Sequence, residues 1–143
     1  MGTPIARAGS VIPADTRPWW MTALAVACFA FLVVNVCRDL FVADARDVEV
    51  WLGFEIRGRP AILTAPLHWA ILATGAWAFW TCRRWVVPWT AAYLFYAAVS
   101  HVVWSEASPH GRGWPIGVAQ AVAISLLGIL LLRARPPAAR PTR

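Results

Sequence analysis

The side chains best suited to chemistry in this sequence are a few polar residues set inside long apolar stretches. His68, His101, Asn35 and Gln120 each lie within about two helical turns of one end of such a stretch. Ionisable and polar side chains at membrane depth are costly and often mark functional sites. Two imidazoles on facing helices can ligate a metal or the two axial positions of a haem. The same pair can also hydrogen-bond a quinone carbonyl.

We therefore define two overlapping candidate sites. The cofactor-binding candidates are His68, His101 and Gln120, and the metal-ligand candidates are His68, His101 and Glu106. Asn35 and Asp39, one turn apart on the same helical face, are expected to orient these groups. The pattern leaves open whether the bound group is a haem, a metal or a quinone, because two histidines alone specify none of them.

A structural role is the favoured alternative for the same residues. Polar side chains near the ends of membrane helices commonly hydrogen-bond across helices, at about 0.6 kcal/mol each. Motifs such as H-E-x-x-H, C-x-x-C, G-x-S-x-G and the phosphate-binding glycine loop are absent from the sequence. We therefore predict no catalytic residues and favour a non-enzymatic protein.

The elements that must position these residues are four apolar runs. The chain of 143 residues is 59% hydrophobic and only 14% charged, against about 25% charged residues in soluble domains. The run from Pro66 to Cys82 would extend about 26 Å as a helix, close to the hydrocarbon thickness of a bilayer. Pro18, Pro66, Pro88 and Pro115 stand where the four runs begin, a position that suits proline in a helix.

The predicted fold is an all-α integral membrane protein, a bundle of four transmembrane helices. We expect the first helix to stay uncleaved, because its apolar run is longer than that of a signal peptide. The expected segments are a tail over 1–17, helices over 18–42, 65–82, 88–105 and 115–133, connections over 43–64, 83–87 and 106–114, and a basic tail over 134–143.

The connection over 43–64 has its own pattern. Apolar residues stand at every second position from Val48 to Ile56, namely Val48, Val50, Leu52, Phe54 and Ile56, which predicts a half-buried strand. We expect a β-hairpin with its turn over 57–60 and a returning strand over 61–64. Val50 and Phe54 would share a buried face, and Glu49 and Glu55 would face water. The alternative is an amphipathic helix lying in the membrane interface.

The arginines predict the orientation of the bundle. Eight of the 13 basic residues, all arginine, fall on the side that holds both termini and the 83–87 loop, and five fall on the other side. This excess predicts cytoplasmic termini. Nine of the 10 tryptophans lie at or near the ends of the runs, as expected of an aromatic belt.

These observations lead to one functional hypothesis and one alternative. The hypothesis is a small bacterial inner-membrane protein with an accessory, assembly or interaction role. Its partners would be the lipid bilayer and another membrane protein or further copies of the chain. The net charge of +6 does not indicate nucleic acid, because the arginines cluster at helix ends. The alternative is a redox or quinone-, haem- or metal-binding protein that uses His68 and His101 near the outer face.

Overall fold

The computed structural model describes residues 17–43 and 45–134, which form four helices and one small sheet. Their order is α1 (Trp19–Phe41), β1 (Val48–Trp51), β2 (Phe54–Arg57), α2 (Arg59–Trp80), α3 (Val86–Ala107) and α4 (Trp114–Arg133). Each of the four helices is long and apolar enough to cross a membrane. The predicted set of four apolar helices is therefore confirmed, as is a two-stranded element between the first two.

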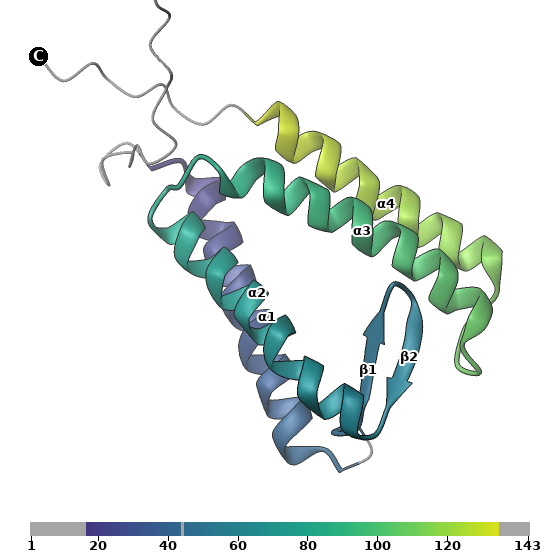
Figure 1. Ribbon diagram of the computed structural model, residues 1–143. Coiled ribbons are helices and arrows are strands. Elements are labelled where there is room, and N and C mark those ends of the chain that lie inside the picture. Colours follow the sequence, from purple (N-terminus) through teal and green to yellow (C-terminus); the bar gives the residue numbers. More distant parts are fainter. Residues whose placement is uncertain (1–16, 44, 135–143) are drawn as a thin grey trace, which may run out of the picture.

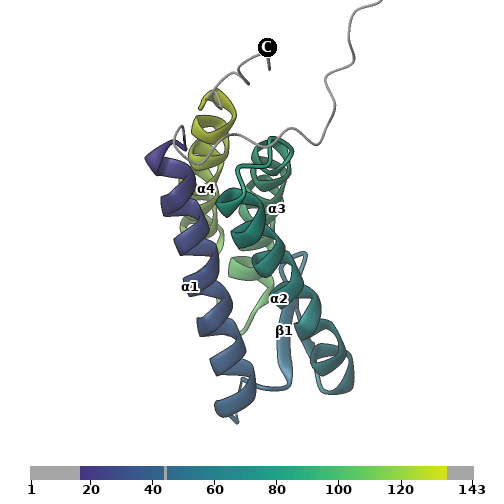
Figure 2. The ribbon, with the colours of Figure 1, turned by 90° about the vertical axis from the view of Figure 1, so that its left-hand side faces the viewer.

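The helices pack as two pairs. α1 lies along α2, and α3 lies along α4, whereas α2 and α3 touch over a much shorter stretch. Figure 1 shows the two pairs as the arms of a V, with the hairpin standing between them near the open end. The view in Figure 2, turned by a quarter circle, shows α1 and α2 side by side in front of the second pair. We refer to these pairs as the α1/α2 arm and the α3/α4 arm.

The closed end of the V holds the core. Met21 near the start of α1, Phe79 near the end of α2 and Val86 at the start of α3 are almost completely buried there. Leu131 near the end of α4 joins the same cluster, so all four helices contribute to it. Both arms are therefore fixed to one another at this end, and they diverge towards the hairpin.

The start of α2 differs from the prediction. The helix begins at Arg59 and runs through Pro66, so the predicted turn over 57–60 and the predicted strand over 61–64 are both wrong. Gly58, with a φ of 72°, ends the hairpin, and Pro60 takes the opening position of the helix that the sequence had suggested for Pro66. A proline fits this first turn because its missing N–H has no intrahelical partner there.

The hairpin turn lies at Leu52 and Gly53 instead. Both residues have positive φ, 53° and 85°, as a two-residue turn of type I′ requires. The antiparallel register pairs Val50 with Glu55 and Trp51 with Phe54.

This turn changes which side chains share a face. Paired residues point to the same side of a hairpin, so Val50 and Phe54 lie on opposite faces instead of one buried face. The expectation that Glu49 faces water is also wrong, because Glu49 is 3% exposed while Phe54 is 59% exposed. One face therefore carries Glu49, Trp51, Phe54 and Ile56, and the other carries Val48, Val50, Glu55 and Arg57.

Candidate functional site

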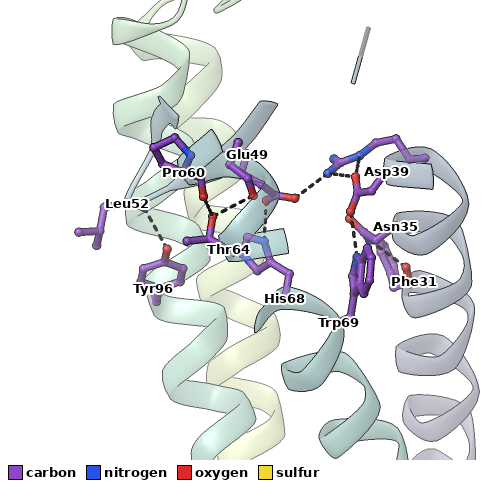
Figure 3. Close-up of polar contacts among 12 residues, drawn as sticks. Phe31, Asn35, Asp39, Glu49, Leu52, Pro60, Thr64, His68, Trp69 and Tyr96 are labelled. Carbon is purple, nitrogen blue, oxygen red and sulfur yellow. Dashed lines mark hydrogen bonds and ion pairs between the residues drawn. The ribbon is translucent and has the colours of Figure 1, made fainter. Parts of the chain in front are cut away.

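Glu49 on β1 is the centre of a polar network at the open end of the α1/α2 arm (Figure 3). Its Oε1 accepts a hydrogen bond from Nη2 of Arg38, on α1, at 3.1 Å. Its Oε2 lies 2.7 Å from Nδ1 of His68, on α2. Since the carboxylate side chain is only 4% exposed, both contacts are largely withdrawn from water. The hairpin is thus tied by one side chain to both helices of the arm.

Asp39 extends the network along α1. Its carboxylate is 2.7 Å from the Arg38 guanidinium and accepts a hydrogen bond of 2.9 Å from the indole N–H of Trp69. Asp39 and Glu49 are both buried, whereas the Arg38 side chain is 41% exposed. Two carboxylates therefore share one guanidinium, and contacts with the Trp69 indole N–H and the His68 imidazole complete their coordination, as buried charges require.

The imidazole of His68 is held on two sides. The ring stacks on Trp51 with centroids 4.2 Å apart and planes within 3° of parallel. Its Nδ1 faces Glu49. Nε2 has no hydrogen-bond partner among the described residues, and it is not enclosed by protein atoms. The second ring nitrogen is therefore oriented and available to a ligand.

Two cavities meet at this imidazole. A groove of about 920 Å³, which we call the inter-arm groove, runs between the arms from Trp20 and Leu131 near the closed end to Arg38 and Glu49. A smaller space of about 290 Å³, the small cavity, lies between His68 and α3. Both cavities are lined by Val50, His68, Tyr93 and His101.

The small cavity contains an unusual polar atom. Oγ of Ser100, on α3, is enclosed and has no hydrogen-bond partner among the described residues. Buried polar groups in folded proteins are nearly always hydrogen-bonded, so each exception calls for an explanation. Tyr93 and His101 line the same space, which is therefore an apolar cavity with several polar groups.

The opposite face of the hairpin is fixed to α3. Glu55 accepts hydrogen bonds from the Ser108 hydroxyl and the Trp104 indole N–H, and its other oxygen lies 2.7 Å from the Arg57 guanidinium. The hydrogen bond from Ser108, followed by that from Arg57, holds the pKa of the Glu55 carboxyl below its ordinary value. At the turn, the backbone N–H of Leu52 donates to the Tyr96 hydroxyl at 2.9 Å.

The structure separates the predicted site residues into two groups. His68 and His101 line both cavities. Asn35 lines the inter-arm groove, and its side-chain amide donates a hydrogen bond to the backbone carbonyl of Phe31. Asp39 belongs to the Glu49 network. Gln120 and Glu106 are exposed and line neither cavity.

Among residues 17–43 and 45–134, no group of three or more His, Cys, Asp and Glu side chains is arranged to hold a metal ion. The sequence reasoning also missed Glu49, Arg38, Trp51 and Ser100. For Glu49 a signal existed in the sequence. An acid in a strand that follows the Arg38-Asp39 pair at the end of an apolar run can be the ion-pair partner of that arginine.

Comparisons with known proteins identify no relative. No protein-family model matches the sequence. Neither the curated proteins nor the solved structures give a match.

Proposed function

We propose that this chain is a small integral membrane protein that holds an amphiphilic small molecule between its two arms without converting it. The observation that carries the proposal is the composition of the inter-arm groove. Its walls near the closed end are apolar, including Trp20, Leu127 and Leu131, and its other end presents Arg38, Glu49 and His68. A molecule with a polar head and an apolar tail matches this gradient along its length.

The size of the groove supports a ligand of this kind. About 920 Å³ lies within the 300–1,000 Å³ typical of small-molecule sites. A third cavity of about 600 Å³ shares Cys28, Leu72, Thr90 and Tyr93 with the groove, so the space between the arms extends towards a second side. A long apolar tail would find room there.

The proposed setting is a bacterial inner membrane with both termini in the cytoplasm. The excess of arginine in the parts of the sequence that hold both termini and the 83–87 loop supports this orientation. Reporter fusions after Val50, Arg84, His110 and Arg140 test it, and the expected result is a cytoplasmic signal from the second and fourth fusions alone. A cytoplasmic signal at Val50 would contradict the proposed orientation.

Ligand extraction tests the binding function. The protein is purified from its membrane in a mild detergent, and co-purified molecules are extracted and identified by mass spectrometry. Leu127 lines the groove and is 57% exposed, whereas its neighbour Leu126 is 54% exposed and does not line it. We expect Leu127→Trp to lose the bound amphiphile at least tenfold, because the indole fills the groove, and the matched control Leu126→Trp to retain it.

Two outcomes would contradict the proposal. One is a wild-type protein that carries only bulk lipid, in the proportions of the surrounding membrane. The other is a second membrane protein, recovered in a fixed ratio, whose binding is lost in Leu127→Trp. The second result would assign the groove to a transmembrane helix of a partner and would support an interaction role instead.

A further inference from the structure

The hydrogen bonds of Glu49 determine where the proton on a neutral His68 lies. An ionised carboxylate has no proton to donate, so it accepts from Nδ1 of His68 through Oε2. Its other oxygen, Oε1, is already engaged by Arg38. The neutral imidazole therefore carries its hydrogen on Nδ1, and Nε2 presents a lone pair.

The lone pair of Nε2 can find a donor in the space that the ring lines. Trp51 covers a face of the His68 ring, and the ring lines the small cavity and the adjoining groove. Across the small cavity lies the enclosed Ser100 hydroxyl, which lacks a partner among the described residues. A ligand hydroxyl in the space beside the ring can satisfy Nε2, because a hydroxyl donates a hydrogen bond.

The local charge restricts the rest of the head group. Asp39 and Glu49 bring two negative charges and Arg38 brings one positive charge within direct contact. When His68 is neutral, this excess of negative charge lies behind its ring, and an anionic head in the poorly solvated space in front of the ring would be disfavoured. A neutral head avoids this cost.

From these three observations we infer that the small cavity binds the hydroxyl-bearing head of a neutral amphiphile, and that this hydroxyl donates a hydrogen bond to Nε2 of His68. The inference rests on the proposed function, since the tail occupies the inter-arm groove. It reverses the hydrogen bond expected from the sequence, in which histidine would donate to a quinone carbonyl. Hydroquinones and long-chain alcohols share the required chemistry.

Binding of matched probes to the wild-type protein in lipid nanodiscs is the first test. The probes are a decyl-tailed hydroquinone kept under argon, its quinone, its dimethyl ether, and a saturated long-chain alcohol. Binding is measured at about pH 8, above the ordinary titration range of an imidazole side chain. We expect the hydroquinone to bind about tenfold more tightly than the quinone or the ether, the ratio that one hydrogen bond gives. Tight binding of the alcohol as well would extend the ligand class beyond phenolic heads.

The decisive variant is Glu49→Gln. Arg38 can be satisfied only by the amide oxygen, so the amide NH₂ must face Nδ1 of His68. Nδ1 then accepts, the proton moves to Nε2, and His68 becomes a donor towards the cavity. We expect the preference to invert, so that the quinone binds more tightly than the hydroquinone. The control Glu55→Gln, on the other hairpin face, should keep the wild-type order of affinities, with the hydroquinone bound more tightly than the quinone.

Ser100→Leu covers the case in which Glu49→Gln does not fold. The larger side chain fills the small cavity, and we expect hydroquinone binding to weaken at least tenfold while binding of the ether changes little. Equal affinities for hydroquinone and ether in the wild type, or an unchanged order in a folded Glu49→Gln protein, would overturn the inference and leave the groove assignment intact. Failure of every probe to bind, with no co-purified amphiphile, would instead remove the proposed function itself.

Discussion

The two faces of the hairpin are attached to the two arms by different means. Towards the α1/α2 arm, Glu49 is buried at 3% exposure and pairs with Arg38 and His68. Towards α3, Glu55 is a more accessible carboxylate, and the backbone at Gly53 packs so closely on Ser100 and Val103 that a Cβ would have no room. One attachment therefore depends on charges held out of water, and the other combines more accessible hydrogen bonds with close backbone packing.

This difference indicates two roles. The buried charges belong to the candidate site, and the contact with α3 supports the hairpin. A charge pair in a poorly solvated space is sensitive to any change of partner, which suits a position that must respond to a ligand. Close backbone packing has a single favourable arrangement and fixes the depth to which the hairpin enters the V. The buried charges and the close backbone contact thus lie at different positions on one short hairpin.

Removal of Glu49 should give the largest effect. Glu49→Ala leaves His68 without its carboxylate and Arg38 with Asp39 alone, and breaking a buried ion pair costs about 3 kcal/mol of unfolding free energy. Glu49→Gln keeps both hydrogen bonds and should cost about 1 kcal/mol. Thermal unfolding of the variants in one detergent measures the difference. Equal midpoints for Glu49→Ala and wild type would show that the buried network does not stabilise the fold.

Gly53→Ala is expected to be the next most damaging change. An added Cβ would stand 2.5 Å from the carbonyl oxygen of Ser100 and 2.5 Å from Cβ of Val103, at a φ of +85°. Overpacking and left-handed strain together should cost about 2 kcal/mol. Gly58→Ala is the matched control, because its φ is +72° but nothing lies within 4 Å, and the same unfolding measurement should show a smaller loss. Equal losses would mean that strain alone, without close packing on α3, explains the effect.

Acidification should act on Glu55 with the smallest effect of the three. Its pKa in the folded protein is lowered, chiefly by the hydrogen bond from Ser108, so its contribution is complete above the ordinary value of 4.5. The contribution is lost as the pH falls through the lower folded value.

Trp104 fluorescence, isolated by comparison with Trp104→Phe, should therefore change only in that acidic range. Ser108→Ala should move the change towards higher pH, because the carboxylate loses its strongest hydrogen bond. A transition at the same pH in Ser108→Ala would contradict this assignment.

The helices were predictable because their signals are strong and local. Apolar runs of membrane length and bounding arginines placed all four, and the second differs mainly in its start. Pro60 and Pro66 both satisfy the rule for a helix opening, and only the left-handed Gly58 before Pro60 decides between them. A backbone angle of that kind is not visible in hydropathy.

The hairpin faces were harder to predict for a different reason. Strict alternation from Val48 to Ile56 implies one continuous strand, whereas the Leu52-Gly53 turn divides the pattern and reassigns its second half. Leucine is rare at a positive φ, so Gly53 was the only residue of the turn that indicated it in the sequence. His68 was selected from the sequence as a candidate ligand-binding residue and lines the groove, but its partner Glu49 depends on tertiary packing that a period-two pattern does not contain.

The position of the polar network in the chain has a consequence for biosynthesis. Arg38, Asp39, Glu49, His68 and Trp69 all lie within residues 38–69, and every hydrogen bond described among them is made inside this segment. An isolated two-stranded hairpin is marginal in water, so these contacts are what first hold it in place. The nascent chain can therefore neutralise its costly buried charges before α3 has been synthesised. Tyr93, Tyr96 and Ser100, which line the small cavity from α3, then pack against a segment whose polar contacts are already made.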